Sequence, residues 1–265
     1  MDIKHFHRAE SLEEAYQLLT ENPKNIIIGG GIWLKMSKPS VDTLIDLSEL
    51  NLDQVIDRGD FIEIGAMVTL RDYEIHESIR AFGDGFLSQG ISKIYGVGFR
   101  NVATVGGTVA GRYPFSDLIT PLLSLKAKLI FYPKLEMTLE EYLNTKTKMN
   151  HILTHIIIEK EKGKGYFYKV ARTSTEFATL NVAVFNNFNE IRIVVGSRPA
   201  GPVLLHEAME YLNKQKEVTD EVLDKTVQLM LDNTKFGSNY QASIQYRQQL
   251  AQTYVKRGIK EVLTK

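Results

Sequence analysis

The stretch Arg100–Thr108 constrains this chain most, because its sequence RNVATVGGT joins a β-branched run to a pair of glycines. Glycine lets a backbone approach a ligand closely and adopt a positive φ. A Tyr113-Pro114 turn follows, and Asp117 then precedes an apolar helical pattern. Asp117 is therefore a candidate both for capping that helix and for binding sugar-like hydroxyls. By itself, the stretch also fits a strand, a tight turn and a capped helix.

A second glycine-rich turn lies about seventy residues upstream, where Gly29-Gly30-Gly31 follows the β-branched segment 25–28. Successive small residues after a strand can direct several backbone N–H groups at one anion. The turn is not a phosphate-binding loop of the Gly-Lys-Ser/Thr type, and it lacks the third glycine of the dinucleotide fingerprint. It is either a flexible turn or an anion site, and two such turns could hold an elongated diphosphate.

Composition excludes several classes of function. The chain has 265 residues, of which 43% are hydrophobic, enough for one large domain or two modest ones. Its 32 basic and 32 acidic residues cancel, so nothing favours nucleic acid or an anionic membrane. It has no cysteine, which excludes disulfides, a thiolate nucleophile and a cysteine-ligated iron–sulfur cluster in this chain. A polar N-terminus and the absence of a long apolar run predict a cytoplasmic protein without a membrane span.

The pattern of hydrophobic residues predicts alternating helices and strands in the first part. Ser11–Leu19 is typical of a helix, with Ser11 and Glu14 at capping-box spacing. Thr138 and Glu141 have the same spacing. His151 and His155 fall on one face of a predicted strand, and since no further ligands cluster nearby, no metal site is predicted.

The charged, glycine-containing segment 159–165 is the predicted domain boundary, giving domains 1–160 and 161–265. Beyond it the pattern changes to three strands and three helices. The predicted strands are 165–172, 180–185 and 191–195, and the predicted helices are 204–212, 221–231 and 243–263.

The order of these motifs resembles the FAD-binding (medium) subunit of molybdenum hydroxylases of the xanthine dehydrogenase and carbon monoxide dehydrogenase type, over nearly the whole chain. The family's Arg-Asn-x-Ala-Thr-x-Gly-Gly motif matches Arg100–Gly107, and its Pro-x-x-Asp-Leu continuation matches Pro114, Asp117 and Leu118. A third motif, Tyr-x-Lys-x-x-Arg, appears as FYKVAR at 167–172. The segment YRQQLAQTYVKRGI at 246–259 resembles the family's closing helix.

The resemblance implies an α+β fold. Two α/β subdomains would hold FAD between them in a PCMH-type fold, followed by a C-terminal three-stranded sheet with helices. The implied function is electron transfer, from an iron–sulfur subunit that draws electrons from a molybdopterin subunit, to NAD or another acceptor. No side chain need be catalytic, since the cofactor carries the chemistry. The alternatives are a stand-alone flavin oxidoreductase of the UDP-N-acetylenolpyruvoylglucosamine reductase type and a non-catalytic nucleotide-binding assembly subunit.

The resemblance also implies the residues that bind FAD. The pyrophosphate would be held by Ile28, Gly29, Gly30, Gly31, Ile32, Trp33 and Leu34, together with Thr104, Gly106 and Gly107. Asp117 and Leu118 would lie at the ribityl or phosphate region, and Lys169 near the flavin ring, unless it is a surface lysine. Trp33, the only tryptophan, either stacks on flavin or anchors a core or interface. FAD is expected to be noncovalent, since no cysteine can form a thioether.

Several positions depart from the family's pattern. Ala9 stands in place of a proline, and Ile32 in place of a hydroxyl residue that would help to bind phosphate. Thr173 stands where a second arginine is common, and Glu176 where aspartate is common. The departure at Ile32 makes phosphate binding depend more on backbone amides.

Overall fold

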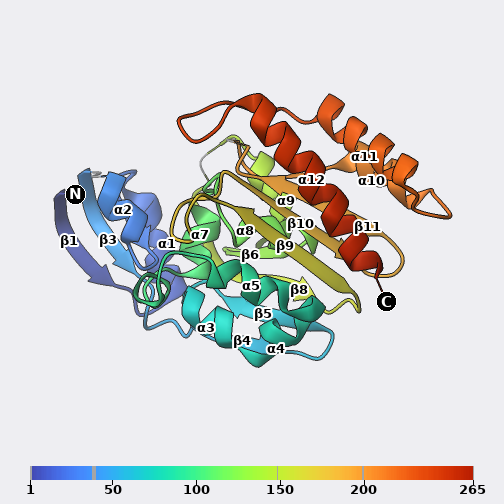
Figure 1. Ribbon diagram of the computed structural model, residues 1–265. Coiled ribbons are helices and arrows are strands. Elements are labelled where there is room, and N and C mark those ends of the chain that lie inside the picture. The colour runs from blue at the N-terminus through green and yellow to red at the C-terminus, as the bar shows by residue number, and fades with distance from the viewer. Residues whose placement is uncertain (1, 38–39, 148, 199, 265) are drawn as a thin grey trace. The chain divides into compact units, whose positions relative to one another are not determined.

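The computed structural model describes residues 2–37, 40–147, 149–198 and 200–264 (Figure 1), and these form two compact units. The chain alternates between the units several times. The first comprises Met1–His76, Gly96–Gly111 and Ala127–Glu159, and the second comprises Glu77–Tyr95, Arg112–Lys126 and Lys160–Lys265. Each unit is therefore assembled from three separate segments of chain. The predicted division into residues 1–160 and 161–265 stays a prediction.

The first unit contains a three-stranded parallel sheet. Its order is β1 (Asp2–Arg8), β3 (Ser40–Asp46), β2 (Ile26–Ile28). Helix α1 (Leu12–Glu21) packs against this sheet, and its residue Ala15 is fully buried. The predicted cap at Ser11 is confirmed, because the Ser11 hydroxyl accepts the N–H of Glu14 at 3.1 Å.

A five-stranded antiparallel sheet completes the strands described in the first unit. Its order is β4 (Val55–Asp57), β5 (Phe61–Gly65), β8 (Ile152–Glu159), β6 (Lys128–Tyr132), β7 (Leu135–Thr138). The helices of this unit after α1 are α2 (Ile32–Ser37), α3 (Leu70–Ile75), α6 (Val97–Arg100), α7 (Val105–Ala110) and α9 (Leu139–Asn144). At the start of α9, the capping box predicted for Thr138 and Glu141 is present.

The second unit is built on a sheet covered on both faces. Its order is β12 (Val203–Leu204), β11 (Ile191–Gly196), β10 (Leu180–Asn186), β9 (Lys164–Val170). Every residue of β10 and β11 is buried, as expected where helices cover both faces. The expected C-terminal sheet with helices is confirmed, but it has four strands instead of the expected three. The additional strand, β12, has only two residues and is too short to leave a periodic signal.

The helices of the second unit divide between the faces of this sheet. They are α4 (Glu77–Ala81), the 3₁₀ helix η1 (Phe82–Gly85), α5 (Phe86–Ser92), α8 (Ile119–Ser124), α10 (His206–Asn213), α11 (Asp220–Asn233) and α12 (Ile244–Leu263). Figure 1 shows α12, in red, along one face, where a side chain at Gly258 would meet Val184. The opposite face carries Phe185, which stacks on Phe86 of α5.

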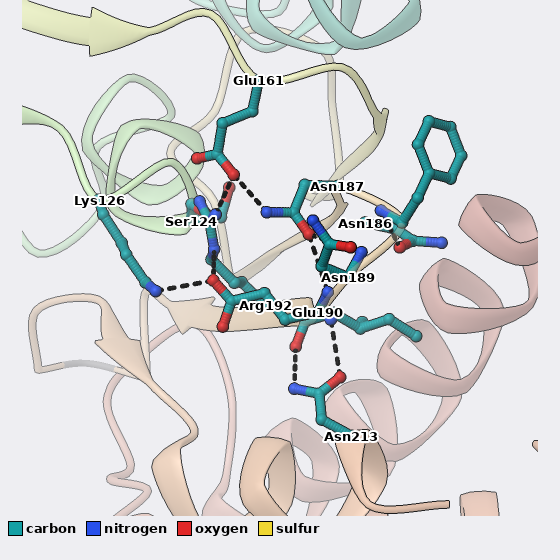
Figure 2. Close-up of polar contacts among 11 residues, drawn as sticks. Ser124, Lys126, Glu161, Asn186, Asn187, Asn189, Glu190, Arg192 and Asn213 are labelled. Carbon is teal, nitrogen blue, oxygen red and sulfur yellow. Dashed lines mark hydrogen bonds and ion pairs between the residues drawn. The ribbon is translucent and has the colours of Figure 1, made fainter. Parts of the chain in front are cut away.

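A buried arginine holds the β10–β11 hairpin to the start of the second unit's last segment (Figure 2). Arg192 forms ion pairs with Glu161 and, at 2.7 Å, with Glu190, and it donates to the Ser124 carbonyl at 3.2 Å. Lys126 pairs with the same Glu190 at 2.7 Å. Glu161, which lies in the segment 159–165 predicted as a boundary, is thus held by this arginine.

Candidate cofactor site

The first glycine turn adopts a conformation that other residues rarely take. Gly30 and Gly31 have φ values of +73° and +70°, in the left-handed region that favours glycine. A Cβ on Gly30 would also lie 1.9 Å from the carbonyl oxygen of Val102. Glycine is therefore required at position 30 for two independent reasons, and α2 begins immediately after the turn.

The two glycine-rich segments, which are far apart in sequence, touch each other within the first unit. A Cβ on Gly29 would lie 2.6 Å from the Thr104 Oγ1, and one on Gly107 would lie 2.8 Å from the Gly29 carbonyl oxygen. Backbone therefore packs directly on backbone, with no room for a side chain between them. We call this arrangement of Gly29–Gly31 with Thr104–Gly107 the glycine cradle.

The central glycine pair lies inside a helix, so the sequence-based expectation of a strand followed by a glycine turn is wrong in its local structure. Thr104 is the N-cap of α7, and its hydroxyl accepts the Gly107 N–H at 3.1 Å. The only strand-like pairing described for Val102–Thr104 is a single bridge from Thr104 to Thr69. Gly106 is required by packing, because a Cβ there would lie 2.5 Å from the Cβ of Ala66. The prediction failed because the same glycine pattern is found in a tight turn and in the capped first turn of a helix.

The backbone amides of the two halves of the cradle differ in their hydrogen bonds. In α7, the N–H groups of Val105 and Gly106 donate to the carbonyls of Val68 and Ala66, both at 2.8 Å. Those of Gly107 and Thr108 donate to Thr104, at 3.1 and 3.0 Å. By contrast, within the described part of the chain the N–H groups of Gly29–Gly31 have no hydrogen-bond partner. The amides available to an anion are therefore those of Gly29, Gly30 and Gly31.

The Thr104 side chain adds one further donor to the cradle. Its oxygen accepts from Gly107 and lies beside Gly29, but in the described residues its own hydroxyl hydrogen has no acceptor. Three amides and one hydroxyl are a suitable set for a phosphate group, which accepts several hydrogen bonds. Because Ile32 supplies no hydroxyl, these groups carry the polar chemistry of the turn.

The arginine of the central motif ties the end of α6 to α3. Arg100 is buried, and its Nε donates to the Glu74 carboxylate at 2.8 Å. Arg71 reaches the same carboxylate at 2.9 Å. Glu74, on α3, was missed by the sequence analysis, because one acidic residue in a polar helical segment gives no distinguishing signal.

The other residues expected around the pyrophosphate occupy half-buried positions in the first unit. Trp33 packs its ring edge-on against Phe99, with centroids 6.2 Å apart, which favours its role as an anchor. Ile28 lies under the turn, since a Cβ on Gly31 would be 2.8 Å from its Cδ1. Ile32 and Leu34 belong to the start of α2.

Asp117 and Lys169 form a buried ion pair in the second unit. Their side chains are 4% and 7% exposed, and Asp117 Oδ2 lies 3.1 Å from Lys169 Nζ. Lys169 also donates to the Lys93 carbonyl at 3.0 Å, so it is not a surface lysine. Within the described residues its third N–H has no acceptor. Burial raises the pKa of Asp117, and the charge of Lys169 opposes that rise.

Asp117 is oriented by Asn181 and does not cap the following helix. Asn181 Nδ2 donates to Asp117 Oδ1 at 2.9 Å. The cap comes from Ser116, whose hydroxyl accepts the N–H of Ile119 at 3.1 Å. Leu118 is fully buried, so its side chain belongs to the core. Asn181 was also missed, although an asparagine within the apolar strand LNVAVF is a recognisable signal.

The described residues contain neither a metal-binding cluster nor a membrane-spanning helix. In residues 2–37, 40–147, 149–198 and 200–264, no cluster of three or more His, Cys, Asp or Glu side chains could hold a metal ion. No helix in the same ranges is long and apolar enough to cross a membrane.

Comparison with known proteins identifies the family. Residues 2–160 match the FAD binding domain in molybdopterin dehydrogenase, a flavin-binding class that the α+β fold and the glycine cradle both fit. Residues 165–262 match the CO dehydrogenase flavoprotein C-terminal domain. The chain belongs to the family of FAD-binding subunits of the molybdenum hydroxylases. The resemblance, the fold class and FAD as the cofactor are thereby confirmed.

Individual relatives cover almost the whole chain at low identity. The xanthine dehydrogenase FAD-binding subunit of Escherichia coli O157:H7 is 26% identical over 285 residues, covering 99% of this chain and 97% of the relative. The glyceraldehyde dehydrogenase medium chain of Sulfolobus acidocaldarius is 23% identical over 273 residues, with 96% of each covered.

Solved structures show the same fold. A crystal structure of Cu,Mo-CO dehydrogenase superposes with a TM-score of 0.88 at 21% identity, covering 98% of this chain and 97% of that chain. Quinoline 2-oxidoreductase from Pseudomonas putida 86 gives a TM-score of 0.87 at 18% identity, covering 99% and 97%.

We expect Gly30→Ala to destabilise the protein by more than about 1 kcal/mol and to abolish FAD binding, because alanine disfavours a positive φ and its Cβ meets Val102. Urea unfolding and flavin content measure the two effects. The matched control is Gly98→Ala, where nothing lies within 4 Å of the new Cβ. That control should be neutral or slightly stabilising, and equal behaviour of the two variants would contradict the steric argument.

We expect Asp117→Asn to lower the free energy of unfolding by about 3–5 kcal/mol, because it leaves the ammonium of Lys169 buried without its counter-charge. Urea denaturation of the FAD-free protein measures this. The control is Glu210→Gln, which breaks the exposed pair with Lys214 and should change little. An unchanged unfolding curve for Asp117→Asn would show that the pair is not held as described.

Proposed function

We propose that this chain is the FAD-carrying electron-transfer subunit of a molybdenum hydroxylase and binds one FAD noncovalently. The observation that carries the proposal is the set of amides at Gly29–Gly31, beside the Thr104 hydroxyl, that have no acceptor in the described part of the chain. A diphosphate is an anion with many acceptor oxygens, so it suits this donor set. In this proposal Gly106 and Gly107 shape the cradle, while Gly29–Gly31 and Thr104 hold the pyrophosphate. The pyrophosphate would be flanked by Ile28, Ile32, Trp33 and Leu34.

Bound FAD would supply the redox chemistry, accepting electrons and passing them on. The protein's part is positioning and electrostatics. In the second unit, Lys169 has one N–H without an acceptor among the described residues and is held by Asp117, so it is our candidate for a contact with the flavin ring. Asp117 would hold that ammonium in place and lie near the ribityl or phosphate region.

The electron donors would be iron–sulfur clusters on a partner subunit, which receive electrons from a molybdopterin subunit. These 265 residues contain no cysteine, so they supply no ligand for a cysteine-ligated cluster. NAD or another molecule would be the acceptor, in the cytoplasm. The 26% identity to a xanthine dehydrogenase subunit makes a xanthine dehydrogenase-like enzyme our candidate complex.

We expect the purified chain to contain one FAD per polypeptide and to release all of it on denaturation. Absorbance spectroscopy of the protein, and of the supernatant after acid precipitation, measures both quantities. Flavin retained in the precipitate would contradict noncovalent binding, and a colourless protein that takes up no added FAD would contradict the proposal as a whole. A chain that turns over a substrate without partners would instead support the stand-alone oxidoreductase.

We expect Lys169→Gln to make the flavin midpoint potential more negative by on the order of 30 mV, equivalent to about 1.4 kcal/mol for a two-electron couple. Removing a nearby cation disfavours the negative charge gained on reduction. Dye-linked reductive titration measures the potential. Lys169→Arg should retain most of it, and Lys93→Gln should leave it unchanged, because Lys93 contributes its backbone carbonyl. No shift in Lys169→Gln would place Lys169 away from the ring.

A further inference from the structure

A row of residues crosses the sheet of the second unit and ends at Lys169. In the β9–β10 pairing Asn181 lies directly opposite Lys169, and in the β10–β11 pairing it lies directly opposite Gly196. Residues that lie opposite each other on neighbouring strands point to the same face of a sheet. Lys169, Asn181 and Gly196 therefore share one face, and it is the face that α8 and the residues before it cover.

Every polar atom of the Asn181 side chain has a partner. Asn181 is 0% exposed, and its Nδ2 donates to Asp117 Oδ1 at 2.9 Å and to the Ser116 carbonyl at 3.3 Å. Thr120, which is also fully buried, donates through its hydroxyl to Asn181 Oδ1 at 2.9 Å. The reversed orientation of the amide would set its oxygen against a carboxylate and a carbonyl, which are both acceptors. The amide nitrogen is thereby fixed toward Asp117.

Gly196 closes this row on the side away from Lys169. A Cβ on Gly196 would lie 2.2 Å from Asn181 Oδ1 and 2.6 Å from Thr120 Oγ1, so no side chain fits there. The Asn181 amide is therefore confined by packing as well as by its hydrogen bonds, and it holds one carboxylate oxygen of Asp117 in place.

Asn181 binds the carboxylate oxygen of Asp117 that Lys169 does not use. Lys169 Nζ lies 3.1 Å from Asp117 Oδ2, whereas the Asn181 amide donates to Oδ1. Lys169 also donates to the Lys93 carbonyl at 3.0 Å, and its third N–H has no acceptor among the described residues. If Oδ1 lost the amide, it would be a buried carboxylate oxygen without a donor, which is costly. Lys169, already bonded to the other oxygen, has a spare N–H with which to satisfy it.

We propose that Asn181 is a positioning residue that keeps the third N–H of Lys169 available to the bound flavin. This inference rests on the proposed function, in which Lys169 contacts the flavin ring. With Asn181 in place, each oxygen of Asp117 has its own donor, and the ammonium is held through one oxygen. Without Asn181, Asp117 binds Lys169 through both oxygens, and the N–H that would face the flavin is lost. The negative charge gained by the ring on reduction is then stabilised less.

The test measures the flavin midpoint potential of the FAD-loaded full chain by dye-linked reductive titration. Asn181→Leu keeps the branching of asparagine and removes its polar atoms. It should lower the ratio of reduced to oxidised flavin at a fixed potential about threefold, equivalent to a midpoint about 14 mV more negative for a two-electron couple. The matched control is Asn186→Leu on the same strand, since Asn186 points to the opposite face and donates to the Val262 carbonyl at 3.1 Å. That control should leave the potential unchanged.

Two further measurements separate positioning from a merely structural role. In a chain that already carries Lys169→Gln, Asn181→Leu should cause no additional shift of the potential, because Asn181 acts only through Lys169. A general loosening of the site would instead add its own shift. A crystal structure of the FAD-free Asn181→Leu variant should show Lys169 Nζ bonded to both carboxylate oxygens of Asp117, and a Lys169 still bonded to one oxygen would contradict the inference.

Melting temperature and FAD content check that the variants are folded. If Asn181→Leu does not fold, Thr120→Val replaces it, because it removes the hydroxyl that holds the amide, and Thr120→Ser should keep the wild-type potential. A wild-type potential in the test variant, an equal shift in Asn186→Leu or an additive shift with Lys169→Gln would overturn the inference and leave the proposed function standing. A wild-type chain that takes up no FAD overturns the proposed function, and the inference fails with it.

Discussion

The close contact between two backbone segments, Gly29 against Thr104 and Gly107, is the constraint on which the candidate site depends. A side chain at Gly29 or Gly107 would collide with the facing segment, so the contact exists only because both are glycine. On the α7 side of the contact, the backbone N–H groups already donate hydrogen bonds to Ala66, Val68 and Thr104. On the other side, the N–H groups of Gly29–Gly31 have no acceptor among the residues that the structure describes. This asymmetry turns a packing contact into a place where an anion can bind.

Buried charges in the second unit are held by different kinds of partner, and the difference suggests different roles. Lys169 faces one carboxylate and one carbonyl and retains an N–H, so it is stabilised by charge and still able to bind a ligand. Arg192 pairs with two carboxylates and also donates to a carbonyl, which suits a purely structural clamp. Among the described residues, Arg247 donates to neutral oxygens alone, and these hydrogen bonds order a loop. Burial alone would not have distinguished these three.

Local patterns in the sequence correctly predicted the features that depend on interactions between neighbouring residues. The caps at Ser11 and Thr138 were predicted correctly, since a capping interaction spans three residues. The assignments of Glu74 to Arg100 and of Asn181 to Asp117 join residues 26 and 64 positions apart, and periodicity carries no information at that range. The glycine pair at 106–107 was misread as a turn for a related reason. The residues packed against this glycine pair are Ala66 and Gly29, and both lie too far away in the sequence to enter a local pattern around residue 106.

The Arg100–Gly107 motif is distinctive as a sequence, although few of its hydrogen-bonding groups are available to a ligand. Arg100 is committed to Glu74, Gly106 to Ala66, and the α7 amides to carbonyls of the first unit. The motif therefore specifies a scaffold that positions another loop. Relatives named for xanthine and glyceraldehyde align over nearly the full chain at 26% and 23% identity. In the proposed function the oxidised substrate binds to another subunit. Subunits of enzymes that are named for different substrates are then expected to share this scaffold.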